Sequence, residues 1–144
     1  MKTVAQLLKL KTEQKVHTID SHQTVFEALL LMAKENVGAL PVLEEGQIAG
    51  IISERDYARK LVLKGRSSMA TPVKEIMNSP VITVDSHQNV QTCMNIMTDK
   101  HLRHLPVVED GVLLGLLSIG DLVKESISEQ AELIKQLEQY IRGE

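Results

Sequence analysis

Two serine–aspartate pairs are the side chains in this sequence best suited to hold a ligand. Ser53 and Asp56 follow one apolar run, and Ser118 and Asp121 follow a second one later in the chain. A serine three residues before an acid at the start of a helix forms a capping box, which requires no ligand. The same arrangement offers N–H groups to a phosphate and a carboxylate to the hydroxyls of a ribose. Taken alone, the residues fit both interpretations.

Each pair lies where a predicted strand runs into a predicted helix, and that junction ends a longer unit. The unit reads as strand, helix, strand, hairpin turn, strand and helix, from the change between two-residue and three- to four-residue apolar spacing. A short helix and a polar link, residues 11–15, precede it. In the first copy the predicted elements are residues 16–19, 25–35, 37–43, 48–52 and 53–63.

The whole unit recurs in the second half of the chain. When residues 16–57 are aligned with residues 81–122, more than a third of the positions are identical, including Asp-Ser-His-Gln and Leu-Pro-Val. A repeat of this length is a duplicated supersecondary unit whose apolar faces cover each other. The sequence therefore predicts an α/β (α+β) fold of tandem β-α-β-β-α repeats packed with pseudo-twofold symmetry.

This pattern divides the chain into three parts. Residues 1–66 hold the N-terminal helix and the first repeat, residues 67–125 hold the second repeat, and residues 126–144 form a C-terminal helical extension. In the last part, apolar residues and one glutamine recur at three- and four-residue steps, at Ile127, Gln130, Ile134, Leu137 and Ile141. Such a stripe packs on its own module, forms the seam of a dimer, or contacts another protein.

Composition and charge argue against several classes of function. The formal net charge is −3 with both signs interspersed, which favours neither nucleic acid nor an anionic membrane as a partner. Two tyrosines, one phenylalanine and no tryptophan supply no platform for stacking bases. We expect a cytoplasmic protein, since no apolar run is long enough for a signal peptide or a membrane span.

Catalytic and metal chemistry have little support in the residues. Cys93 is the single cysteine, so neither an intramolecular disulfide nor a cysteine-based zinc site is possible. The five histidines form no His-Glu-x-x-His pattern, and we predict no metal site. No Ser/His/Asp set or catalytic pair of carboxylates stands out. We therefore predict no catalytic residues and no enzymatic activity.

The repeated motifs resemble those of paired cystathionine-β-synthase-type (CBS) domains, known as Bateman modules. The resemblance covers nearly the whole chain. It rests on Gly-x-x-Ser-x-x-Asp at 50–56 and 115–121, Leu-Pro-Val at 40–42 and 105–107, and Val-x-x-Ile-Met at 73–77. The chain looks most similar to small stand-alone bacterial modules carrying Glu-Arg-Asp-Tyr-Ala-Arg-Lys, here residues 54–60. Such modules resemble adenine-nucleotide sensors rather than enzymes, and commonly pair head to head into a homodimeric disc.

The resemblance implies two quasi-equivalent nucleotide sites in a cleft between the repeats. It assigns the ribose to Asp56 and Asp121. The phosphate-binding residues would be Ser53, Arg55, Arg59, Arg103, His104 and Ser118, and the adenine pockets would be bordered by Thr18, Val37, Ala39, Pro41, Thr83, Leu102 and Pro106. The regulatory ligand would be AMP, ADP, ATP or NAD, with no catalytic cofactor and with a protein partner that the sequence does not identify.

The two implied sites differ in charge, and two other functions fit the sequence. Arg55 and Arg59 add positive charge near the first site, so we expect the Asp56 site to bind more tightly than the second. One alternative ligand is S-adenosylmethionine, which has no phosphate and would need neither Arg103 nor His104. The other alternative is a protein-interaction module that acts through the C-terminal helix.

Overall fold

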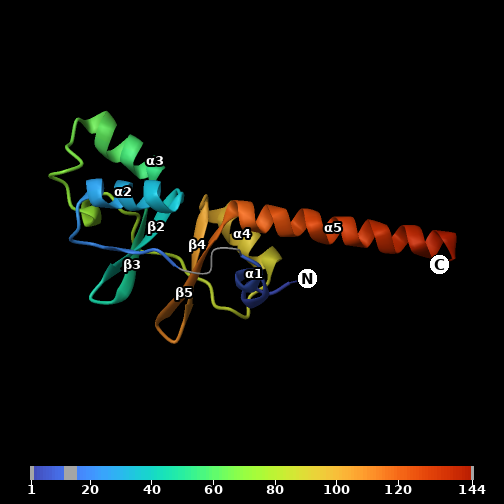
Figure 1. Cartoon of the computed structure of the whole chain (residues 1–144). Coiled ribbons are helices and arrows are strands. Elements are labelled where there is room, and N and C mark those ends of the chain that lie inside the picture. Colours follow the sequence, from blue (N-terminus) through green and yellow to red (C-terminus); the bar gives the residue numbers. More distant parts are fainter. Residues whose placement is uncertain (1, 12–15, 144) are drawn as a thin grey trace.

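Two repeats of one architecture lie side by side in the computed structural model, which describes residues 2–11 and 16–143 (Figure 1). Their two β-hairpins point in the same direction, and strands β3 and β5 contact each other where the repeats meet. The predicted mixed fold of tandem β-α-β-β-α repeats is confirmed. No helix among the described residues is long and apolar enough to cross a membrane.

The first repeat contains a three-stranded sheet in the order β1-β2-β3. Strand β1 runs parallel to β2, and β2 runs antiparallel to β3. Helix α2 begins with a capping box made by Thr24 and Glu27 and ends at Asn36, whose left-handed conformation stops it as predicted. The elements are β1 (Ile19–Asp20), α2 (Val25–Glu35), β2 (Ala39–Glu44) and β3 (Gln47–Ser53), followed by α3 (Glu54–Asp56), the π-helical turn η1 (Tyr57–Leu61) and the 3-10 turn η2 (Val62–Lys64).

The second repeat follows the same plan. Its first strand is reduced to a parallel bridge between Val84 and Val107. Its hairpin has the same register irregularity after the Leu-Pro-Val motif as the hairpin of the first repeat. Its elements are α4 (Val90–Lys100), β4 (His104–Glu109), β5 (Val112–Ser118) and α5 (Ile119–Arg142).

The leading helical segments are exchanged between the repeats. Helix α1 (Val4–Leu10) precedes the first repeat in the sequence, but its Val4 and Leu7 are buried in the core of the second. The 3-10 turn η3 (Val73–Glu75) precedes the second repeat, and its Val73 is buried in the core of the first. Each repeat therefore completes its core with a segment that sequence order places beside the other.

This exchange explains the glycine that opens each Gly-x-x-Ser-x-x-Asp motif. A Cβ atom on Gly50 would lie 2.6 Å from the carbonyl oxygen of Asn78, in the segment after η3. A Cβ atom on Gly115 would lie 2.7 Å from a methyl group of Leu8 in α1. Neither glycine has the positive φ that requires glycine, so close approach of the exchanged segment is the reason for the residue.

Helix α5 extends far beyond the body of the molecule (Figure 1). Of the predicted stripe, Ile127 is 63% exposed, Ile134 is 56% exposed and Ile141 is 82% exposed. Packing of this stripe on the chain's own module is therefore excluded, because the side chains that would do so face solvent.

Candidate ligand site between the two repeats

A cavity of about 330 Å³ lies between the two repeats. One wall comes from the start of β2 in the first repeat, and the facing wall comes from β5 and the start of β4 in the second. The N-terminal segment closes one side with Leu8 and Lys11. The lining residues from the first repeat are Val16, His17, Val37, Gly38, Ala39 and Pro41, and those from the second are His104, Leu114, Gly115, Leu116 and Ser118.

Strands β1 and β2 start later than predicted, and the residues before them line the cavity. Residues 16–18 and 37–38 were predicted as parts of strands, but β1 begins at Ile19 and β2 begins at Ala39. Val16, His17, Val37 and Gly38 line the cavity instead of joining the sheet. The carbonyl oxygen of Gly38 accepts from the backbone N–H of Glu54, and the backbone N–H of Val37 donates to the carbonyl oxygen of Met32.

The second serine–aspartate pair lies at the edge of this cavity. Ser118 lines it and is the N-cap of α5. The backbone N–H of Asp121 donates to Ser118 Oγ at 3.1 Å, and the backbone N–H of Ser118 donates to Asp121 Oδ2 at 2.8 Å. The capping box is thus present, and the Asp121 side chain keeps 26% of its surface exposed. Capping and ligand binding are compatible at this pair.

Lys11 holds the Asp121 carboxylate from across the chain. Its Nζ lies 3.0 Å from Asp121 Oδ2 and donates to the carbonyl oxygen of Leu116 at 2.7 Å. Burial alone would raise the pKa of Asp121, but the hydrogen bonds from Ser118 and Lys11 outweigh it and hold that pKa below its ordinary value. The carboxylate is therefore kept ionised and oriented.

His104 provides a second titratable group in the cavity. It is half-buried, and burial lowers the pKa of its imidazole, an effect that the positive charges of Lys11 and Arg103 reinforce while Asp121 opposes it. Arg103 itself is exposed and does not line the cavity. Lys11 thus supplies positive charge at this site, and two histidines, His17 and His104, also line it.

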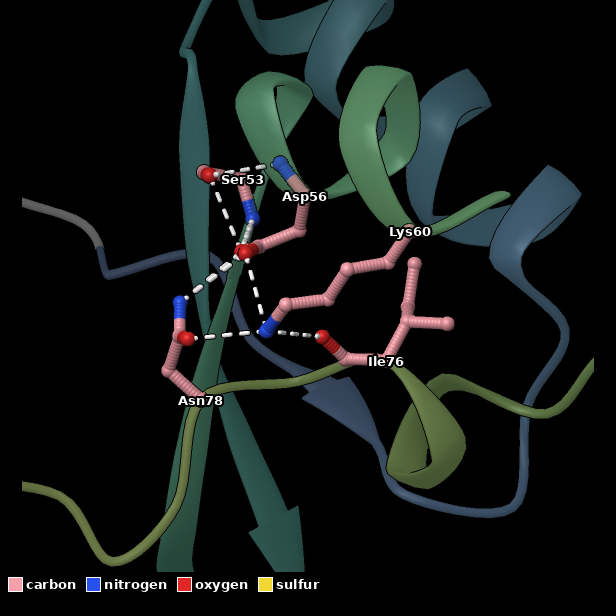
Figure 2. Close-up of polar contacts among 5 residues, drawn as sticks. All are labelled: Ser53, Asp56, Lys60, Ile76 and Asn78. Atoms are coloured by element: carbon pink, nitrogen blue, oxygen red, sulfur yellow. Dashed lines mark hydrogen bonds and ion pairs between the residues drawn. The ribbon is translucent and has the colours of Figure 1, made fainter. Parts of the chain in front are cut away.

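The first serine–aspartate pair is closed by the protein itself (Figure 2). The backbone N–H and hydroxyl of Ser53 both donate to Asp56 Oδ2 at 2.9 Å. Asn78 Nδ2 donates to both carboxylate oxygens, at 3.0 and 3.1 Å, and Lys60 Nζ lies 3.3 Å from Oδ1. Asp56 is only 6% exposed. Both oxygens of its carboxylate therefore have partners within the protein.

Lys60 is fixed in turn by the segment that carries Asn78. Its ammonium group donates to the carbonyl oxygen of Ile76 at 3.1 Å and to Asn78 Oδ1 at 2.9 Å (Figure 2). In each repeat, the residue that reaches the aspartate from outside follows the exchanged helical segment, since Asn78 follows η3 and Lys11 follows α1. The exchange that completes the cores also completes the two polar sites.

The remaining residues implied by the family resemblance fall into two groups. Val37, Ala39 and Pro41 line the cavity. Arg55, Arg59 and Thr83 are exposed, Thr18 is partly buried, Leu102 packs against the second core, and Pro106 is buried. None of these last six residues lines the cavity.

Sequence reasoning missed Lys11, Lys60 and Asn78. Lys60 follows Asp56 by four residues on a helical segment, a spacing that predicts an ion pair and could have indicated it. Lys11 begins the predicted polar link, of which residues 12–15 lie outside the described residues. No local pattern marks Lys11 or Asn78. Among the described residues, no group of three or more His, Cys, Asp or Glu side chains could hold a metal ion.

Comparison with known proteins identifies the repeats. The model of the CBS domain matches residues 7–63 and again residues 73–128. The chain is 43% identical over 125 residues to the mitochondrial CBS domain-containing protein CBSX3 of Arabidopsis thaliana, covering 83% of this chain and 61% of the plant protein. It is 33% identical over 116 residues to the CBS domain-containing protein YhcV of Bacillus subtilis, covering 81% of this chain and 82% of that protein.

Solved structures of CBS-domain proteins have the same fold as this chain. A protein with CBS domains from Burkholderia ambifaria superposes with a TM-score of 0.85 at 49% identity, covering 90% of this chain and 96% of the other. The hexameric CBS-CP12 protein of bloom-forming cyanobacteria superposes with a TM-score of 0.76 at 26% identity, covering 85% of this chain and 70% of the other. With two matched domains and the same fold, the chain belongs to the CBS-domain family, whose tandem domains are generally regulatory ligand-binding modules and typically non-catalytic.

Proposed function

We propose that this chain is a non-catalytic regulatory module that binds an adenine nucleotide in the cavity beside Ser118 and Asp121. The observation that carries the proposal is one cavity between the repeats that combines apolar residues from both of them with a polar rim that includes Lys11, His104 and Ser118. Val37, Ala39 and Pro41 supply the surface for the adenine ring. Asp121, next to the rim, supplies a carboxylate for the ribose hydroxyls, and the rim supplies positive charge for the phosphate.

The electrostatics of the rim fit a phosphate next to a ribose. Ser118 caps a helix of 24 residues, so the positive end of that helix dipole lies at the rim, where the backbone N–H groups of Ile119 and Asp121 already donate to Arg103 O and Ser118 Oγ. Lys11 lies beside the same helix start and already carries the charge that would meet the phosphate. S-adenosylmethionine lacks a phosphate and carries a net positive charge, so its carboxylate would be the one group able to pair with Lys11.

Cavity size narrows the choice of nucleotide. Binding pockets for small molecules have volumes of roughly 300 to 1,000 Å³. At about 330 Å³ this cavity is at the low end of that range. AMP therefore fits better than NAD or ATP.

The geometry favours the opposite order of affinity for the two sites. The Asp56 site was expected to bind more tightly because of Arg55 and Arg59, but both arginines are exposed. The Asp56 carboxylate already accepts from Ser53 and Asn78 and pairs with Lys60. A ribose at Asp56 would have to displace Asn78. We therefore propose that the Asp121 site binds first.

Calorimetric titration with AMP, ADP, ATP, NAD and S-adenosylmethionine tests the proposal. AMP should bind with one high-affinity site per chain. Asp121→Asn should weaken that binding at least about tenfold, because it removes a charged acceptor worth about 1.5–3 kcal/mol. Asp56→Asn is the matched control in the other repeat and should leave the first binding event unchanged.

Two results would contradict the proposal. Unchanged AMP affinity in a folded Asp121→Asn variant would remove Asp121 from the site, and loss of the high-affinity event in Asp56→Asn alone would place it at the first pair. The melting temperature checks both variants, because each aspartate also caps a helix. A ligand that binds only the folded chain should raise the melting temperature of the wild type.

A regulatory module must pass the binding event to something else. Closure of the cavity by ligand would shift the population of two relative positions of the repeats. A related tandem CBS protein is hexameric, which supports self-association of this chain as well.

A further inference from the structure

Helix α5 has one face committed to the body of the molecule and one face that is not. Leu122 and Glu125 are buried, and Glu125 accepts from Lys2 Nζ at 2.8 Å. A second face is apolar and exposed along the whole helix. Its side chains, which are 42 to 82% exposed, are Val123, Ile127, Ile134, Leu137 and Ile141. Leu133 and Tyr140, which are 55% and 83% exposed, lie between this face and the side of Leu122.

We propose that this face binds the same face of a second copy of the chain, with the two α5 helices antiparallel. The spacing supports a helix–helix seam, because Val123, Ile127, Ile134, Leu137 and Ile141 recur at three, four or seven residues. That is the repeat by which two helices keep one stripe in contact along their length. Gln130 occupies the one remaining seam position.

The stripe is self-complementary in the antiparallel direction. With the twofold axis at the level of residue 132, Val123 packs against Ile141 of the second copy. In the same register Ile127 packs against Leu137 of the second copy, and Gln130 lies beside Ile134. Every seam residue from Val123 to Ile141 has a counterpart, over about 28 Å of helix at 1.5 Å per residue.

The residues that flank the seam select the antiparallel direction. In that arrangement Lys124 of each copy lies beside Glu138 of the other, and Leu133 lies beside Leu133 across the axis. In the parallel arrangement Leu133 would lie beside Glu138, and Lys124 would lie beside Ile119. Antiparallel pairing thus joins opposite charges twice and apolar residues at the centre.

The body of the molecule leaves this face accessible at both ends. Near the body, Val123 is 42% exposed and Ile119 is 48% exposed. Leu122 and Glu125, which hold the helix to the second repeat, point away from the seam. A second α5 helix can therefore reach the base of the first.

Chemical cross-linking distinguishes the direction of the pair. Ala131 lies beside the twofold axis and is exposed. The full chain with Cys93→Ala and Ala131→Cys should therefore give a covalent dimer with a short bifunctional maleimide. Ile127→Cys in the same background is the matched control. Two copies of residue 127 lie about 15 Å apart along an antiparallel pair, at 1.5 Å per residue, but directly opposite each other in a parallel one.

A charge exchange tests the register independently. Lys124→Glu alone and Glu138→Lys alone should each raise the dissociation constant of α5-mediated association about tenfold in sedimentation velocity, because like charges then meet at both ends. The double variant should restore wild-type association. Helix content from circular dichroism should stay unchanged in all three variants.

Each other outcome overturns the proposal. Cross-linking at position 127 but not at 131 would mean a parallel pair, and failure of the double variant to recover would mean a different register. Absence of cross-linking at both positions would mean that α5 does not bind a second copy, and contact with a different protein would then be the remaining role for its apolar face. Each copy carries a single cysteine, which lies on α5. A dimer formed through another surface keeps the two cysteines apart and should therefore give no cross-link.

Discussion

The side-chain amide of Asn78 donates to both carboxylate oxygens of Asp56, at 3.0 and 3.1 Å. An amide thus occupies the position at which a ribose would offer its two hydroxyls to the same carboxylate. The equivalent carboxylate, Asp121, is held by Lys11 through only one of its oxygens, and its capping partner Ser118 lines a cavity. The two repeats have therefore diverged into one closed and one open polar site.

This relationship predicts that Asn78→Ala will change the stoichiometry of AMP binding. Removal of the amide frees the Asp56 carboxylate, so we expect a second AMP to bind, giving two per chain in place of one. The lost hydrogen bonds to a charged group should also cost about 1.5–3 kcal/mol of folding free energy. Calorimetry and urea unfolding measure the two effects, and a stoichiometry that stays at one would show that Asn78 does not block the site.

The motif glycines provide a second prediction. Gly50→Ala should destabilise the fold by about 1–3 kcal/mol, because its Cβ would meet a backbone oxygen that cannot rotate away. Gly115→Ala should cost less, since its Cβ meets the end of the Leu8 side chain. In a Leu8→Ala background the cost of Gly115→Ala should fall further, and urea unfolding of the four chains gives the coupling energy.

Gly120→Ala is the matched control for both glycines. A Cβ there would lie 3.6 Å from Ser118 Oγ, which is an ordinary contact, and the residue is in the first turn of a helix. Alanine should therefore be neutral or stabilise by up to about 1 kcal/mol. Equal losses at positions 50 and 120 would contradict the close-approach explanation.

Elements that depend on neighbouring residues could be predicted from the sequence. The bounds of α2, the stop at Asn36, the two hairpins and the long C-terminal helix all follow from patterns within a few residues. The capping boxes at Ser53 and Ser118 follow from the same kind of pattern.

The contacts that decide which site is open could not be predicted in this way. Lys11 reaches Asp121 across 110 residues, and Asn78 reaches Asp56 across 22. Both contacts depend on the exchange of α1 and η3 between the repeats. The spacing of apolar residues in the sequence does not predict that exchange. Tertiary packing, rather than helix or strand propensity, places these side chains.

Lys11→Gln should reduce stability in a pH-dependent way. Asp121 has a pKa below its ordinary value in the folded chain, so its contribution is present above the ordinary value of 3.8 and is lost as pH falls through the folded pKa. The variant should therefore melt at a lower temperature near pH 7, by an amount corresponding to about 1 kcal/mol, and the difference should shrink below about pH 4. Thermal melts across this range measure it, with Lys135→Gln on exposed α5 surface as the control.

A difference that is constant with pH would mean that Lys11 acts only through its backbone contact. Its ammonium group also donates to the carbonyl oxygen of Leu116, which does not titrate. The pH dependence therefore separates the ion pair with Asp121 from that second hydrogen bond.

His104 should make AMP binding depend on pH. Burial lowers its pKa, which favours the neutral imidazole, and a phosphate nearby would favour the protonated form. AMP affinity should therefore rise as pH falls from about 8 to about 6, with uptake of a proton on binding. Calorimetry in buffers of different ionisation enthalpy measures that uptake. In His104→Gln the pH dependence should shrink to that of the AMP phosphate itself, and an unchanged dependence would place the phosphate away from His104.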